Sequence, residues 1–157
     1  MENRARVAIR EANVLDADAL AKLHGEVWRS SFADVVPEEV LAGREERSRE
    51  RFSAVLAGHV PATVWIAESE GEVCGFAQAE AEGPTAVRSL KLTALYVRPE
   101  LQRRGIGGSL LLRAIGDAPA YLWTRPGPAQ RFYEKHGFVV DGAESEMVGI
   151  PIVRMVR

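Results

Sequence analysis

The order of secondary structure around one glycine-rich segment constrains the fold of this chain more than any other feature. Residues 89–97 are apolar and partly β-branched, which predicts a strand that stops at Pro99. A helix is predicted from Gly107 to about Ile115, followed by a short strand at 121–123 and a helix at 128–136. Strand–helix–strand order predicts a parallel pair of strands joined by a crossover.

The first half of the chain adds helices and an antiparallel part. Residues 7–9 form a short apolar stretch, and Asp16 is expected to cap a helix whose apolar stripe includes Leu20 and Leu23. A second helical region is predicted from Pro37 through a charged stretch to Gly58. Residues 63–67 and 73–79 then predict a hairpin. The sequence therefore predicts one α/β domain over residues 1–157, with a mixed, mostly antiparallel central sheet and flanking helices.

Composition excludes several classes of protein. The length of 157 residues suits one domain, and 20 Lys and Arg against 22 Asp and Glu leave too little positive charge for a general nucleic-acid binder. Cys74 is the only cysteine, so no internal disulfide is expected, and no Cys/His spacing predicts a metal site. The charged residues 1–6 and the absence of a long apolar run predict a cytoplasmic protein with neither signal peptide nor membrane partner.

The segment between the strand and the helix reads Gln-Arg-Arg-Gly-Ile-Gly-Gly-Ser at 102–109. Such a turn exposes backbone N–H groups and directs a helix amino terminus at a ligand, and both features favour phosphate oxygens. Arg103 and Arg104 would add charge-assisted hydrogen bonds. A dinucleotide fingerprint would need glycine at Leu110, and a P-loop would need a lysine that is absent. Taken alone, the segment is also compatible with a solvated turn.

Two ordered motifs resemble those of the GNAT superfamily of acyl-CoA-dependent N-acetyltransferases. Leu-Tyr-Val-Arg-Pro at 95–99, followed by Gln-Arg-Arg-Gly-Ile-Gly at 102–107, is similar to the acetyl-CoA loop of that family. Ala-Gln-Arg-Phe-Tyr-Glu-Lys-His-Gly-Phe at 129–138 resembles its second landmark. Residues 23–41 are similar to the two N-terminal helices of such proteins, so the resemblance spans nearly the whole chain.

The resemblance implies a GNAT-like fold with a splayed parallel strand pair, and acetyl-CoA as the acetyl donor without a metal. Backbone groups of Leu95, Tyr96 and Val97 would pair with the pantetheine. The pyrophosphate would be held by Gln102, Arg103, Arg104, Gly105, Ile106, Gly107, Gly108 and Ser109. Tyr133 matches the tyrosine that protonates the departing thiolate. The partner would be an amine-bearing small molecule or peptide, and the family resemblance makes a homodimer one expected assembly.

The chain departs from the family pattern where relatives place a general base. Lys91 and Thr124 stand at positions where many relatives have glutamate, and Pro126 replaces a common asparagine. Glu80 and Glu82 are candidate proton acceptors, although each is also typical of a solvated surface. A primary amine has a pKa near ~10.4, so some group must take its proton at neutral pH.

Trp28 and Phe32 lie where relatives bind the acceptor, and Trp28 is equally compatible with a core position. Cys74 has no neighbouring His and acid to activate it, so we expect Cys74 to be a buried residue of a strand. The sequence therefore predicts N-acetyl transfer to a primary amine by direct attack in a ternary complex. The alternative is a CoA-binding sensor or regulatory module with weak or no catalysis, because the family carboxylates are missing.

Overall fold

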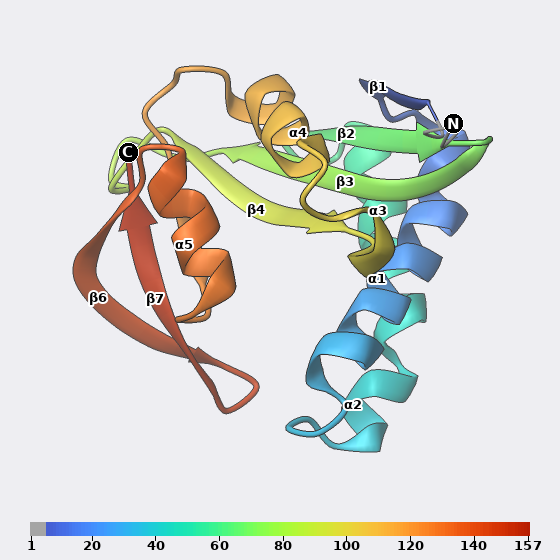
Figure 1. Cartoon of the computed structure of the whole chain (residues 1–157), viewed down its shortest axis with the longest axis horizontal. Coiled ribbons are helices and arrows are strands. Elements are labelled where there is room, and N and C mark those ends of the chain that lie inside the picture. Colours follow the sequence, from blue (N-terminus) through green and yellow to red (C-terminus); the bar gives the residue numbers. More distant parts are fainter. Residues whose placement is uncertain (1–5) are drawn as a thin grey trace.

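The computed structural model describes residues 6–157, and a seven-stranded sheet runs through it in the order β1-β2-β3-β4-β5-β7-β6 (Figure 1). Most of the charged N-terminal segment considered above lies outside the described residues. The strands are β1 (Val7–Glu11), β2 (Ala62–Ser69), β3 (Glu72–Ala81), β4 (Leu90–Val97), β5 (Tyr121–Thr124), β6 (Val139–Met147) and β7 (Ile150–Val156). The α-helices are α1 (Ala17–Phe32), α2 (Glu38–Ala42), α3 (Arg44–Leu56), α4 (Ile106–Ile115) and α5 (Pro128–Lys135).

The sheet is antiparallel throughout except between β4 and β5, which confirms the predicted mixed architecture. These two strands are parallel and pair only at Lys91 and Tyr121. Beyond that pair they diverge, and α5 lies between β4 and β7 in Figure 1. The crossover through α4 thus produces a sheet in which β4 and β5 separate beyond their one pair of residues.

Helices cover both faces of the larger half of the sheet. Leu20, Leu23 and Phe52 of α1 and α3 pack against Ile66 and Phe76 of β2 and β3. On the other face, Ile106 and Leu110 of α4 pack against Ala67 and Ala77. Adjacent residues of each strand therefore enter opposite cores, because side chains alternate along a strand. Among the described residues, no helix is long and apolar enough to cross a membrane.

The helices differ from the prediction in two details. The region after Pro37 is divided at Gly43 into α2 and α3. Asp16 lies at the N-cap position of α1, as predicted, but its side chain makes no capping hydrogen bond to that helix. Asn13 caps the short turn before α1 by accepting a hydrogen bond from the Leu15 N–H at 3.0 Å. The Asp16 carboxylate accepts from the Asn13 N–H at 2.8 Å and from Arg10 at 2.8 and 2.9 Å, and the pairing with Arg10 lowers its pKa.

Candidate active site

The glycine-rich segment forms a tight turn at the amino end of α4. Arg103 and Gly105 both have positive φ, at 62° and 82°, and the Gln102 Nε2 donates a hydrogen bond to the Val97 carbonyl oxygen at 3.0 Å. The first amides of a helix have no intrahelical acceptor, so those of α4 remain available for a ligand. Nothing lies within 4 Å of the position that a Gly105 Cβ would take, which leaves the turn open. The turn therefore fits an anion such as a pyrophosphate.

Gly108 has a packing role that the sequence did not reveal. A Cβ on Gly108 would lie 3.1 Å from the ring of His136, the residue that follows α5, which is a tight contact. A Cβ on Gly107 would lie 3.4 Å from the Phe132 ring, which is an ordinary contact. The small residue at 108 therefore allows α4 to approach the end of α5 closely. The loop sequence alone indicates only the phosphate-binding role.

The edge of β4 that faces β5 is largely unpaired. The Arg98 N–H donates to the Cys74 carbonyl oxygen of the β3 side at 2.8 Å. Peptide groups alternate in direction along an antiparallel ladder, so Tyr96 also bonds toward β3, whereas Leu95 and Val97 face the gap. The Val97 carbonyl oxygen already accepts from Gln102, which leaves the Val97 N–H and both peptide groups of Leu95 for a ligand. Leu95 and Val97, rather than Tyr96, can thus pair with an extended ligand in the gap.

Tyr133 lies on α5 and is buried in the core of the smaller half of the sheet, beside Phe132 and Phe138. Burial raises the pKa of its phenol well above the ordinary range, and the nearby Tyr96 phenol raises it further. Tyr133 therefore keeps its proton at neutral pH. It can serve as a donor but not as a base.

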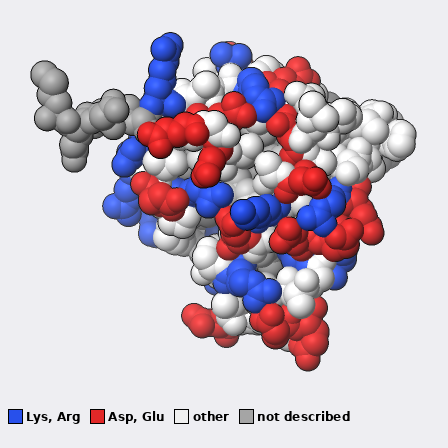
Figure 2. Space-filling model, turned by 90° about the vertical axis from the view of Figure 1, so that its right-hand side faces the viewer, with Lys and Arg blue, Asp and Glu red and all other residues white. Residues whose placement is uncertain are grey.

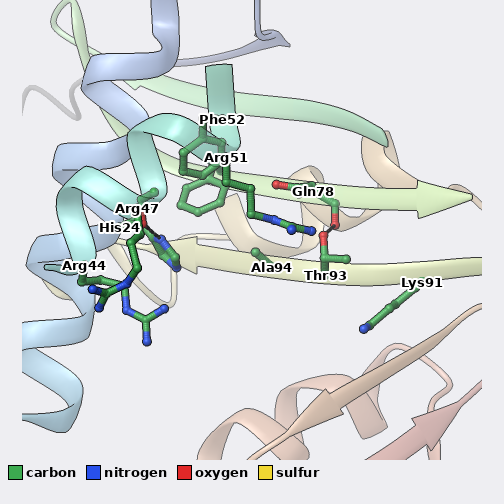
Figure 3. Close-up of a pocket in the computed structure, with 11 residues that line it drawn as sticks. His24, Arg44, Arg47, Arg51, Phe52, Gln78, Lys91, Thr93 and Ala94 are labelled. Atoms are coloured by element: carbon green, nitrogen blue, oxygen red, sulfur yellow. Dashed lines mark hydrogen bonds between the residues drawn. The ribbon is translucent and has the colours of Figure 1, made fainter. Parts of the chain in front are cut away.

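A cavity of about 320 Å³ lies on the α1 and α3 side of the sheet, against β3 and β4 (Figure 3). Its floor includes a bulge in β4, where Thr93 is the extra residue between the pairs Gln78–Ala94 and Ala79–Leu92. The bulge directs both Thr93 and Ala94 toward the cavity. The lining residues are His24, Arg44, Arg47, Ser48, Arg51, Phe52, Phe76, Gln78, Lys91, Thr93 and Ala94.

The lining contains four basic side chains and no carboxylate. Arg44, Arg47 and Arg51 are spaced as one stripe of α3, and Lys91 approaches from β4 (Figure 3). The sequence analysis did not identify these residues as a site. The spacing of the arginines at i, i+3 and i+7 is the signal that could have indicated it.

His24 connects α1 to the cavity wall. The Trp28 Nε1 donates to His24 Nε2 at 3.1 Å, and His24 Nδ1 lies 2.6 Å from the Ser48 hydroxyl oxygen. Burial lowers the pKa of His24 to about 4, and the charge of Arg44 contributes to the shift. The ring is therefore neutral at pH 7, and the Trp28 bond places its proton on Nδ1, which donates to Ser48.

The predicted acceptor-side residues occupy different surroundings. Trp28 and Phe32 are buried in a cluster with Val36, Leu41 and Ile150, and neither lines the cavity. Glu80 lies beside the cavity and pairs with Arg51 at 3.4 Å. Glu82 accepts a hydrogen bond from the Tyr121 hydroxyl at 2.8 Å.

Cys74 is buried and donates from Sγ to the Ala67 carbonyl oxygen at 3.3 Å, as expected of a strand residue in the core. Burial raises the pKa of its thiol. The thiol is therefore protonated at neutral pH, which is unfavourable for a nucleophile.

Known proteins have a similar fold and a related sequence. The structure resembles the crystal structure of the PaiA N-acetyltransferase from Thermoplasma acidophilum in complex with coenzyme A, with a TM-score of 0.76 and 21% identity, covering 95% of this chain and 98% of that one. A spermidine N(1)-acetyltransferase of the same organism is 24% identical over 151 residues, covering 88% of this chain and 91% of that protein.

Two further matches are decisive. Residues 61–140 match the model of the acetyltransferase (GNAT) domain. A probable N-acetyltransferase of Mycobacterium tuberculosis is 32% identical over 147 residues, covering 88% of this chain and 83% of that protein. The chain therefore belongs to the GNAT family of acetyltransferases, as its two sequence motifs predict.

Proposed function

We propose that the protein transfers an acetyl group from acetyl-CoA to a primary amine by direct attack in a ternary complex. The observation that carries the proposal is the continuity of the site along β4. The α4 turn follows the strand, the largely unpaired peptide edge of Leu95 and Val97 lies in the strand, and the Thr93 bulge lines the cavity. One strand thus aligns a phosphate cradle, a strand-like docking edge and a cavity of small-molecule size.

The residues of the chain have separate tasks in this mechanism. The α4 turn, Arg103 and Arg104 hold the phosphates, and the Leu95–Val97 edge holds the pantetheine. Bound acetyl-CoA supplies the thioester carbonyl that the amine attacks. The Leu95 N–H, which faces the gap, is suited to donate to the oxygen on which negative charge develops. Tyr133 holds the proton that the departing thiolate requires.

Glu80 is the carboxylate best placed to take the proton from the amine, directly or through a water molecule. It pairs with Arg51 and lies opposite Lys91 in the β3–β4 ladder, and both of these residues line the cavity. Glu82 is engaged by the Tyr121 hydroxyl. This difference supports Glu80 over Glu82.

The test is a steady-state assay of thiol release from acetyl-CoA over a panel of primary amines, with the acetylated product identified by mass spectrometry. We expect turnover with at least one amine and its loss in Gly107→Asp. The alternative is a CoA-binding module without transferase activity. It is supported by Lys91, which stands at a position where many relatives have a glutamate that acts as the general base. Tight acetyl-CoA binding in calorimetry without turnover of any amine would favour that alternative.

A further inference from the structure

We propose that the acceptor is a small amine that carries a carboxylate or phosphate group, and that the basic lining of the cavity binds this anionic group. The inference rests on the proposed function and deepens it by naming the class of acceptor. It draws on an arrangement that no sequence motif indicated: Arg44, Arg47, Arg51 and Lys91 line one cavity from two elements of the fold, the first two beside His24 and the last two toward Thr93 (Figure 3).

The positive charge of this cavity is poorly compensated. Within residues 6–157, only Arg51 among the four cations forms an ion pair, with Glu80. Arg47 donates from Nη2 to the Val40 carbonyl oxygen at 2.8 Å, and Arg44 lies over the Trp28 ring with its Cζ 3.7 Å from the centroid. The face that Figure 2 shows differs, because acidic and basic side chains are interspersed over it. The cavity therefore concentrates one sign of charge, which favours an anion.

Two buried donors in the same lining have no hydrogen-bond partner among the described residues. They are the Nε of Arg44 and the Nε2 of Gln78, whose residue is only 3% exposed. A buried donor without an acceptor is costly, so such groups in a native protein are usually satisfied by a ligand or by water. An oxygen atom of a ligand in the cavity would be a suitable acceptor for either donor.

The Ser48 hydroxyl adds a further donor. Because His24 Nδ1 donates to the Ser48 oxygen, the proton of that hydroxyl is free to point to another acceptor. Ser48 is buried and lines the cavity. A neutral His24 thus orients a hydroxyl donor in the lining to which the arginines also belong.

The cavity is separate from the predicted pyrophosphate cradle. The cavity lies on the α1 and α3 side of the sheet around Thr93, whereas the cradle follows Val97 at the amino end of α4, which packs on the opposite side. The volume of about 320 Å³ suits an amine of metabolite size. The four cations of the lining would repel a polyamine. We therefore do not expect spermidine, which the name of one relative gives as its substrate, to be the acceptor here.

The experiment compares amines in matched charged and neutral forms. The probes are glycine, β-alanine, aspartate and glutamate with their carboxamides, phosphoethanolamine with ethanolamine, and spermidine. The kcat/KM of each is measured for the wild type, for Arg47→Gln and for Arg49→Gln. Arg49 is the matched control, because it lies on the same helix, pairs with Asp18, Glu45 and Glu46, and does not line the cavity. Calorimetric binding of the same acids and of inorganic phosphate is measured in parallel.

We expect at least one acid to exceed its neutral counterpart by about tenfold or more in kcat/KM, the effect of a charge-assisted hydrogen bond. Arg47→Gln should reduce this preference by about tenfold, and Arg49→Gln should retain it. The carboxylate and phosphate probes show which anion is preferred. Higher kcat/KM for the amides or spermidine than for every acid would overturn the inference and leave the proposed function intact. Anion binding that Arg47→Gln weakens, in the absence of any turnover, would support the anion site while refuting the transferase. Absence of both anion binding and acid preference would overturn the inference.

Discussion

The hydroxyl oxygen of Ser48 on α3 lies 2.6 Å from Nδ1 of His24 on α1, and this contact joins the two helices at the wall of the cavity. The imidazole is also edge-on to the rings of Phe52 and Phe76, at 5.9 Å between centroids in each case. A charged imidazole would be poorly solvated among these rings. These rings, and the hydrogen bond that Nε2 accepts from Trp28, therefore favour a neutral His24.

Stability should fall with acid because of His24. Its pKa is lowered to about 4 in the folded protein from 6.5 in the unfolded chain, so the unfolded chain binds the proton first as the pH falls. The stability is fully present above pH 6.5 and is lost between 6.5 and about 4, by roughly 3 kcal/mol. Urea unfolding across this range checks the prediction. His24→Gln should remove most of this pH dependence, and an unchanged slope would contradict it.

Gly107→Asp should weaken acetyl-CoA binding by at least about tenfold, because its carboxylate would oppose phosphate at the α4 amino terminus. The added Cβ would lie 3.4 Å from the Phe132 ring, an ordinary contact, so the fold should persist. Calorimetry on the folded variant measures the effect. Gly107→Asn is the control of equal size, and equal affinity of both variants would show that charge is not the cause.

Replacing Arg103 and Arg104 together with alanine should lower the affinity for CoA and flatten its dependence on salt, since exposed charges are screened. Single variants compared with CoA and dephospho-CoA show which phosphate each arginine contacts. Arg103→Gly serves as a control for the backbone, because it removes the guanidinium but suits the φ of 62° at that position. An unaltered salt slope in the double variant would refute the phosphate contacts.

Tyr133→Phe should lower kcat while leaving acetyl-CoA affinity nearly intact. General-acid help is worth ~10²–10⁴-fold, and we expect the low end because a thiolate with a pKa near ~8.5 leaves tolerably well unaided. The ring contacts with Phe132 and Phe138 are retained, so stability should hold. Steady-state kinetics with a working amine, together with separate binding measurements, tests this. A wild-type kcat in this variant would show that the Tyr133 hydroxyl is not the proton donor and that the ring only packs.

Glu80→Gln should lower kcat by about tenfold or more, because the amine would lose its proton acceptor. The KM of an anionic acceptor should stay level or fall, because Arg51 would lose its carboxylate partner. Glu82→Gln is the matched control and should remain near the wild-type kcat. Equal losses in both variants would remove the special role of Glu80.

Local patterns in the sequence determined the glycine-rich loop and its surroundings. The 102–109 segment, the helix that follows it and the strand–helix–strand order could be predicted because their signals are short-range: glycine conformation, helical period and crossover handedness. The hairpin of β2 and β3 was predictable for the same reason. These elements yield the family and one end of the site.

Only the tertiary structure decided the composition of the cavity. The arginines of α3 belong to a charged stretch that is typical of a solvated helix, and Lys91 and Gln78 are remote from them in the chain. The packing of α3 over β3 and β4, and the bulge at Thr93, bring these side chains around one cavity. Side-chain convergence of this kind depends on helix rotation and strand register, which no local pattern encodes. The sequence thus determined where the glycine-rich turn and its helix lie, and the fold decided which charge the cavity presents.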